Sequence, residues 1–135
     1  MPPQPTAKAK VPQISDAEWE VMKVLWDRAP ASAQDVVDAL AASRSWSPQT
    51  VKTLLKRLTE KGAVSYQAEG RRFIYRTAVS RDAAEKSESR SFLARVFDGA
   101  VTPALMHLME MGELSPEDIK QLKKTLDQTL DKEAR

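Results

Sequence analysis

Residues 46–62 read WSPQTVKTLLKRLTEKG, and this stretch holds the signals for a complete helix from its start to its end. Ser47 is a typical N-terminal cap, and Pro48 follows at the first helical position, where the missing amide hydrogen costs nothing. Gly62 stands where a left-handed C-terminal cap belongs. In between, aliphatic residues recur at the spacing of one helical face: Val51, Leu54, Leu55 and Leu58. The stretch therefore predicts an amphipathic helix that buries this face.

The opposite face of this helix is polar and basic. Long cationic side chains attract phosphates of any sequence, whereas glutamine and threonine have the size and the hydrogen-bonding groups to read base edges. The candidate DNA contacts on the helix are Ser47, Gln49, Thr50, Lys52, Thr53, Lys56 and Arg57. Because a basic helical face is more often a solvated surface, this face alone does not establish DNA binding.

Two shorter helices are expected before this one. Ser15 and Glu18 form a capping box at the start of the first helix, which ends near Arg28. Ser32 starts the second helix, with Asp35 in its first turn. The residues expected to face inward are Trp19, Met22, Leu25 and Trp26 in the first helix and Ala33, Val36, Val37 and Leu40 in the second.

After Gly62 the pattern changes to the period of a β-strand. Alternating residues over 64–68 predict one strand and residues 73–77 a second, with the sequence EGRR at 69–72 as the turn between them. Two strands alone are marginal in water, so the aromatic side of this hairpin is expected to pack on the preceding helices. The residues on that side are Tyr66, Phe73 and Tyr75.

Positive charge is concentrated in residues 44–79, which contain eight Lys and Arg residues and two Glu residues and carry a net charge of +6. The whole chain carries only +2. Two of these cations, Arg71 and Arg72, lie in the predicted hairpin turn, where we expect them to reach the DNA backbone or the minor groove. A basic block of this kind is the pattern expected of a surface that binds a polyanion.

Three helices followed by a two-stranded hairpin form the element order of a winged helix-turn-helix, in which the third helix enters the DNA major groove. We therefore predict a mainly α fold with a small β-hairpin wing: a winged helix-turn-helix over residues 14–79, followed by a helical dimerisation region over 80–135. Residues 1–13 contain four prolines, two lysines and no aromatic residue, and they predict a flexible tail. The alternative function is a protein-interaction module of the same fold, whose basic face binds an acidic partner.

Residues 80–135 predict three amphipathic helices, the second opening at Thr102 and Pro103 and the third after Ser115. A segment of this size buries too little apolar surface by itself. A twofold-symmetric homodimer would solve this problem and would place two reading helices on one inverted repeat. The alternative is that these helices fold back on the N-terminal domain. The residues assigned to the dimer interface are Phe92, Leu93, Val96, Phe97, Leu105, Leu108, Met109, Ile119, Leu122, Leu126 and Leu130.

Composition excludes several classes of site. The chain of 135 residues has no cysteine and one histidine, His107, which excludes thiolate metal sites, iron–sulfur clusters and multi-histidine metal centres. It has no glycine-rich phosphate loop and no plausible nucleophile–base pair, so we expect a protein that is not an enzyme and that uses no cofactor or metal. No apolar stretch approaches the length of a membrane span or of a signal-peptide core, which favours the cytoplasm.

Several segments together resemble a known family, the penicillinase-repressor (BlaI/MecI/CopY) family of transcriptional repressors. They are residues 14–22, 46–58, 61–62, 91–93, 96–99 and 114–119. The resemblance implies a homodimeric winged-helix repressor that binds double-stranded DNA at a palindromic, inverted-repeat operator. The DNA contacts of the family fall on residues 47–57 and on the hairpin near Arg71 and Arg72. We expect such a repressor to control a resistance or stress-response operon of the beta-lactamase type.

The resemblance also implies a mode of induction. In beta-lactam-responsive members, a membrane sensor–protease system leads to cleavage in the dimerisation region, and the scissile Asn–Phe bond of the family aligns with His107–Leu108. This chain contains no asparagine. Copper-responsive members carry C-terminal cysteine pairs, which this chain lacks. A copper–thiolate switch is therefore excluded.

Overall fold

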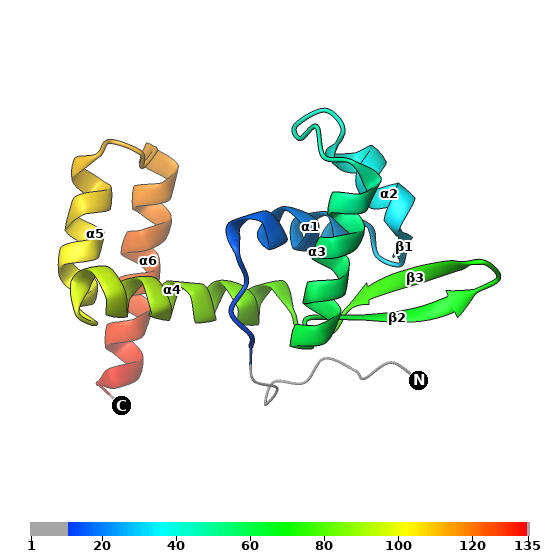
Figure 1. Cartoon of the computed structure of the whole chain (residues 1–135). Helices are drawn as coiled ribbons and strands as arrows, with labels where there is room; N and C mark the ends of the chain where they lie inside the picture. The colour runs from blue at the N-terminus through cyan, green and yellow to red at the C-terminus, as the bar shows by residue number, and fades with distance from the viewer. Residues whose placement is uncertain (1–10, 135) are drawn as a thin grey trace. The chain divides into compact units, whose positions relative to one another are not determined.

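The computed structural model describes residues 11–134, and its helices and strands appear in the order that the sequence predicts, with one strand added (Figure 1). The elements are α1 (Asp16–Arg28), β1 (Ala31–Ser32), α2 (Ala33–Leu40), α3 (Pro48–Lys61), β2 (Val64–Glu69), β3 (Arg72–Thr77), α4 (Arg81–Phe97), α5 (Val101–Glu110) and α6 (Pro116–Glu133). The predicted fold class, mainly α with a small β wing, is confirmed.

The predicted flexible tail covered residues 1–13, of which residues 1–10 lie outside the described residues. At residues 11–13 the chain is packed rather than free. Val11 is partly buried against the hydrophobic core, and the carbonyl oxygen of Gln13 accepts a hydrogen bond of 2.8 Å from Lys61 Nζ. The packed part of the chain therefore includes residues that the proline content had assigned to the tail.

Most helix starts follow the predicted capping chemistry. The hydroxyl oxygens of Ser15, Ser32, Ser47 and Ser115 each accept a hydrogen bond from the backbone amide three residues on. The prediction for α5 was wrong, because this helix begins at Val101 and its N-cap, Ala100, has no side-chain cap. Proline lacks an amide hydrogen and is tolerated throughout the first turn, so Pro103 marks that turn without fixing its first residue.

The sheet has three antiparallel strands in the order β1–β3–β2. The sequence predicted only the two strands of the hairpin, because a strand of two residues is too short to show alternation. Ala31 pairs with Tyr75 and Ser32 with Ile74. This pairing makes β3 the central strand and ties the base of the hairpin to the start of α2.

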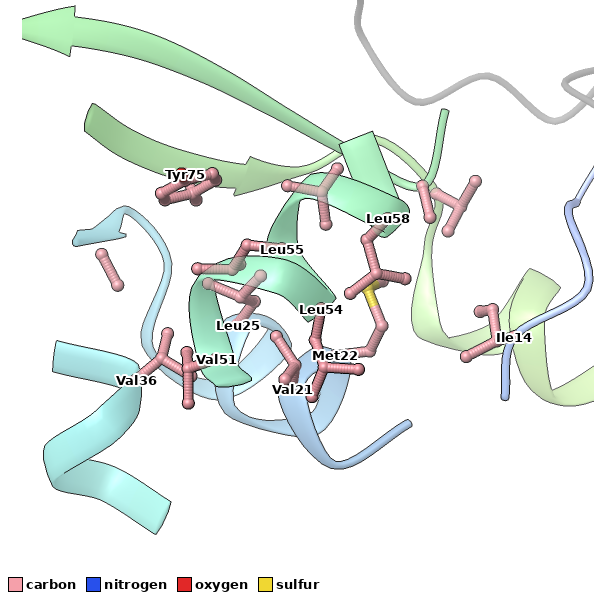
Figure 2. Close-up of a cluster of buried hydrophobic side chains, with 14 of the residues drawn as sticks. Ile14, Val21, Met22, Leu25, Val36, Val51, Leu54, Leu55, Leu58 and Tyr75 are labelled. Carbon is pink, nitrogen blue, oxygen red and sulfur yellow. The ribbon is translucent and has the colours of Figure 1, made fainter. Parts of the chain in front are cut away.

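The hydrophobic core within residues 14–84 forms where α1, α2 and α3 meet under the base of the hairpin (Figure 2). The predicted stripe of α3 is buried, as are Met22, Leu25, Val36 and Leu40 on the preceding helices. Trp26 is only partly buried, and its indole Nε1 donates a hydrogen bond of 3.0 Å to the carbonyl oxygen of Val79. Packing against α1, α2 and the base of the hairpin therefore fixes the orientation of α3 about its axis.

The prediction that all three aromatic residues of the hairpin pack on the helices was wrong. Tyr75 is 9% exposed, whereas Tyr66 is 49% and Phe73 50% exposed. Alternation does place the three side chains on one face, since Tyr66 pairs with Tyr75 and Phe73 lies two residues before Tyr75. The helices cover only the base of the central strand, so the edge strand and the outer part of the hairpin extend beyond the core.

One buried ion pair was not predicted. Glu18 is 1% exposed, and its Oε1 accepts hydrogen bonds from the Ser15 backbone amide and from Lys61 Nζ at the end of α3. Burial by itself raises the pKa of the Glu18 carboxyl, but the hydrogen bonds from Lys61 and Ser15 outweigh it, and the pKa lies below its ordinary value. The sequence showed Glu18 only as a cap, because its ionic partner is far away along the chain.

The described chain divides into two compact units, and the boundary falls between Ser89 and Arg90 within α4. The first half of α4, which the sequence assigned to the dimerisation region, therefore belongs to the unit that contains the sheet, where Ala84 is buried in the core. The second unit contains the rest of α4 with α5 and α6, and residues 111–115 connect the last two helices (Figure 1). Among its described residues, Ala104 is the one that is buried.

Over residues 11–134, none of the helices combines the length and the apolar character needed to cross a membrane.

The buried pair of Glu18 and Lys61 can be tested by removing its cation. The contribution of Glu18 to the free energy of unfolding should then change with pH in the opposite direction. We expect Lys61→Met to lower the free energy of unfolding at pH 7 by about 2 kcal/mol, less than for a fully buried pair because the Lys61 side chain is 35% exposed. In the native protein the lowered pKa of Glu18 stabilises the fold above about pH 4.5, and this contribution is lost as the pH falls through the folded-state value. In the variant, burial raises the pKa of Glu18, so acid relieves the destabilisation.

Urea unfolding at pH 7, 5.5 and 4 measures the free energy of unfolding of the native protein and of Lys61→Met. The difference in unfolding free energy between them should shrink toward pH 4. Lys86→Met, which removes the cation of an exposed pair with Asp82, is the matched control and should change stability little at any pH. A difference that stays constant with pH would contradict this account of Glu18.

Candidate nucleic-acid interface

The N-terminal end of α3 is built by its cap. The Ser47 hydroxyl oxygen accepts a hydrogen bond of 3.2 Å from the Thr50 amide, and the two hydroxyl oxygens lie 3.1 Å apart. Both side chains are exposed, but their hydroxyl groups already have partners within the protein. Contacts from Ser47 and Thr50 to DNA would therefore share a hydroxyl group with the helix cap.

The exposed face of α3 carries the cations that the sequence predicts for it. Gln49, Lys52, Lys56 and Arg57 are exposed, and Thr53 is half-buried. Within residues 11–134, the three cations of this face form no ion pair with a carboxylate. Their charge is therefore available to an external anion.

Thr53 departs from the simple picture of a base-reading hydroxyl. Its Oγ1 donates a hydrogen bond of 3.0 Å to the carbonyl oxygen of Gln49, one turn earlier in the helix. The hydroxyl hydrogen is thus occupied, and what remains for DNA is an acceptor lone pair and the methyl group. A methyl group suits contact with the C5-methyl of thymine.

The hairpin presents Arg71 and Arg72 at its turn, and both are exposed. The turn depends on Gly70, whose φ of +66° lies in the left-handed region that side chains other than glycine rarely adopt. Hydrogen bonds with Ser32 hold the pKa of the Asp35 carboxyl below its ordinary value, and the positive charge of Arg72 adds to this effect. The charge of Arg72 in the hairpin thus favours the ionised form of a carboxyl in the first turn of α2.

A groove of about 790 Å³ lies between α2, α3 and the hairpin. It brings together four of the predicted contact residues, Lys52 and Lys56 from the helix and Arg71 and Arg72 from the hairpin. The other predicted contacts do not line it. They are Ser47, Gln49, Thr50, Thr53 and Arg57, all on α3 or at its cap.

Other residues that line this groove were not predicted as part of the interface, notably Gln34, Glu60, Tyr66 and Phe73. The alternation in the sequence predicted that Tyr66 and Phe73 lie on the same face of the hairpin, and the strand register confirms it. The sequence contains no signal for how far the hairpin extends beyond the helices. These two side chains were for this reason assigned to the core rather than to a surface.

Comparison with known proteins identifies the family. Residues 14–128 match the family model described as penicillinase repressor. This chain belongs to the penicillinase repressor family. Among its relatives, the penicillinase repressor of Bacillus licheniformis is 38% identical over 119 residues, which are 88% of this chain and 93% of that protein.

Two further relatives agree with this assignment. The methicillin resistance regulatory protein MecI of Mammaliicoccus sciuri is 31% identical over 118 residues, covering 87% of this chain and 96% of that protein. The solution structure of the DNA binding domain of the repressor BlaI is 43% identical and superposes with a TM-score of 0.50, over 55% of this chain and 90% of that one. The predictions of a DNA-binding repressor and of a protein that is not an enzyme are confirmed by this membership.

The individual contact residues stay predictions. Two substitutions on α3 distinguish a phosphate contact from a base contact. Lys56→Ala should weaken binding to all DNA sequences by a similar factor and reduce the slope of log affinity against log salt by about one, because one phosphate contact is lost. Thr53→Ala should relax the preference at one base pair and leave the slope unchanged. Both are measured by titrating labelled duplexes at several salt concentrations.

Lys23→Ala, on the exposed surface of α1, is the matched control for loss of one positive charge. The assigned face is wrong if Lys56→Ala binds nonspecific DNA as tightly as the native protein does.

Proposed function

We propose that this repressor binds an inverted-repeat operator as a homodimer and controls a resistance or stress-response operon of the beta-lactamase type. The observation that carries the proposal is the basic face of α3. Its cations are unpaired within the described residues, and two of them, Lys52 and Lys56, share a groove with the arginines of the hairpin. The relatives include a penicillinase repressor and a methicillin resistance regulatory protein, which supports the class of operon. A cytoplasmic location follows from the proposal, since operator DNA lies in the cytoplasm of bacteria.

The homodimer is supported by the apolar surface of the second unit. Of the residues assigned to the interface, Leu93 and Phe97 are half-buried, and the others are exposed. The exposed ones are Phe92, Val96, Leu105, Leu108, Met109, Ile119, Leu122, Leu126 and Leu130. Exposed apolar side chains in this number are typical of a surface that contacts a partner, and a second copy of the chain offers the complementary surface by symmetry.

Induction by a membrane sensor–protease system is part of the proposal, with His107–Leu108 as the position that aligns with the family's cleavage site. Both residues lie in the last turn of α5, and the ring of His107 lies 5.7 Å from that of Phe97 in α4. A protease binds an extended backbone, so cleavage at this bond requires local unwinding of α5. His107 and Leu108 stand where the family's scissile bond has asparagine and phenylalanine, so a protease that cleaves here must accept histidine in place of asparagine.

The test of operator binding begins with selection of duplexes from a random pool, followed by gel-shift titration. We expect an enriched inverted repeat that binds at least about a thousandfold more tightly than a scrambled duplex, with affinity that falls steeply between 50 and 200 mM salt. Equal affinity for both duplexes would overturn sequence-specific repression. Tight binding to an acidic protein without binding to any duplex would favour the protein-interaction module instead.

The dimer is tested by Leu126→Asp on α6. A carboxylate in a desolvated apolar contact costs several kcal/mol, so the variant should shift toward monomer and lose operator affinity. Sedimentation at micromolar concentration measures the species, and Gln128→Asp, an exposed polar position of the same helix, is the matched control. A native protein that is monomeric under these conditions would refute the dimer.

A further inference from the structure

The hairpin carries an aromatic pair that the fold itself does not use. The rings of Tyr66 and Phe73 lie 4.8 Å apart between centroids, and each side chain is about half exposed. Tyr75, the third aromatic residue on this face, is buried in the core instead. Aromatic side chains bury large areas when they find a partner, so an exposed pair of this kind is typical of a contact surface.

The pair contributes to the apolar lining of the groove between α2, α3 and the hairpin, together with Ala33, Val37, Pro48 and Tyr75. Lys52 and Lys56 border the groove on the helix, and Arg71 and Arg72 border it on the hairpin. Glu60 is the one carboxylate residue among those that line it. The groove thus combines cations from two elements with an aromatic surface between them, which matches a ligand that alternates anionic and apolar groups.

A DNA backbone has this alternation, since each anionic phosphate is followed by a deoxyribose with an apolar face. The two grooves of a duplex are separated by a single backbone strand. If α3 lies in the major groove and the tip of the hairpin reaches the adjacent minor groove, this strand must pass between the helix and the hairpin. Lys52 and Lys56 of α3 and Arg71 and Arg72 of the hairpin line the groove from both sides of that path.

We propose that the groove between α3 and the hairpin holds one strand of the operator, with deoxyribose faces packed on Tyr66 and Phe73 and phosphates between the lysines and the arginines. The inference rests on the proposed function and adds two contact residues to it. These residues are neutral, so they contribute affinity that does not depend on salt. They also fix the angle at which the hairpin follows the backbone.

The first test is the affinity of Phe73→Ala and Tyr66→Ala for the selected inverted repeat. Each variant should bind about tenfold more weakly, as expected for the loss of one well-packed aromatic contact, and the slope of log affinity against log salt should stay that of the native protein. Tyr66→Phe and Phe73→Trp keep a ring and should bind within about twofold of native affinity. Thermal unfolding checks that the variants are folded. We expect them to fold because both positions are half exposed.

Glu60 provides a test of opposite sign. A carboxylate that faces phosphates repels them, so Glu60→Gln should bind the duplex several-fold more tightly at low salt. Asp27→Asn changes the net charge by the same amount at an exposed position on α1 and does not line the groove. It should leave the affinity nearly unchanged.

The occupancy of the groove is read directly from fluorine NMR. The chain has three phenylalanines, at positions 73, 92 and 97, so uniform labelling with 4-fluorophenylalanine gives three signals, and Phe73→Leu identifies one of them. Addition of the selected duplex should shift and broaden the Phe73 signal, whereas a polyanion without sugar rings, such as inorganic polyphosphate, should not reproduce the shift.

The outcomes separate this inference from the function on which it rests. If the native protein selects no duplex, the proposed function fails. If the native protein binds its duplex but Phe73→Ala and Tyr66→Ala bind equally well, or if the Phe73 signal does not move, the groove is empty in the complex and the inference is overturned. A reduced salt slope in Phe73→Ala would also overturn it, because the loss would then come from displaced arginines.

Discussion

Burial of one aliphatic stripe on α3 orients the DNA-binding face of this repressor. Val51, Leu54, Leu55 and Leu58 are within the core, and each contributes about 2 kcal/mol through removal of apolar surface from water. Since the stripe can be buried in only one rotation of the helix about its axis, the basic face must point outward. The direction of the candidate interface is thus a consequence of hydrophobic packing, and electrostatics acts on a surface already in place.

Polar interactions at the ends of α3 reinforce this orientation. The Ser47 cap defines its first turn, and Lys61 in its last turn pairs with Glu18 at the start of α1. A buried carboxylate requires its cation, because an unpaired charge in the interior is far more costly than a paired one. The pair therefore links two helix ends that are distant in sequence.

The two units differ in how complete they are in a single chain. The first has a core of its own, to which all three helices and the sheet contribute. In the second, most large apolar side chains of the described residues remain exposed. In the proposed homodimer, this division would keep DNA recognition and assembly on separate surfaces. Changes in the second unit would then alter how many copies of α3 are joined without altering α3 itself.

The sequence by itself determined most of the helix caps, the buried stripe, the strand alternation of the hairpin and the family, because these depend on residues close together in the chain or on motif identity. It did not reveal β1, the ion pair of Glu18, or the exposure of Tyr66 and Phe73. Each of these depends on what lies beside a residue in space: a partner strand, a distant cation, or a helix too short to cover the hairpin. Local patterns specify which face a side chain shares with its neighbours, and only the tertiary structure decides whether something covers that face.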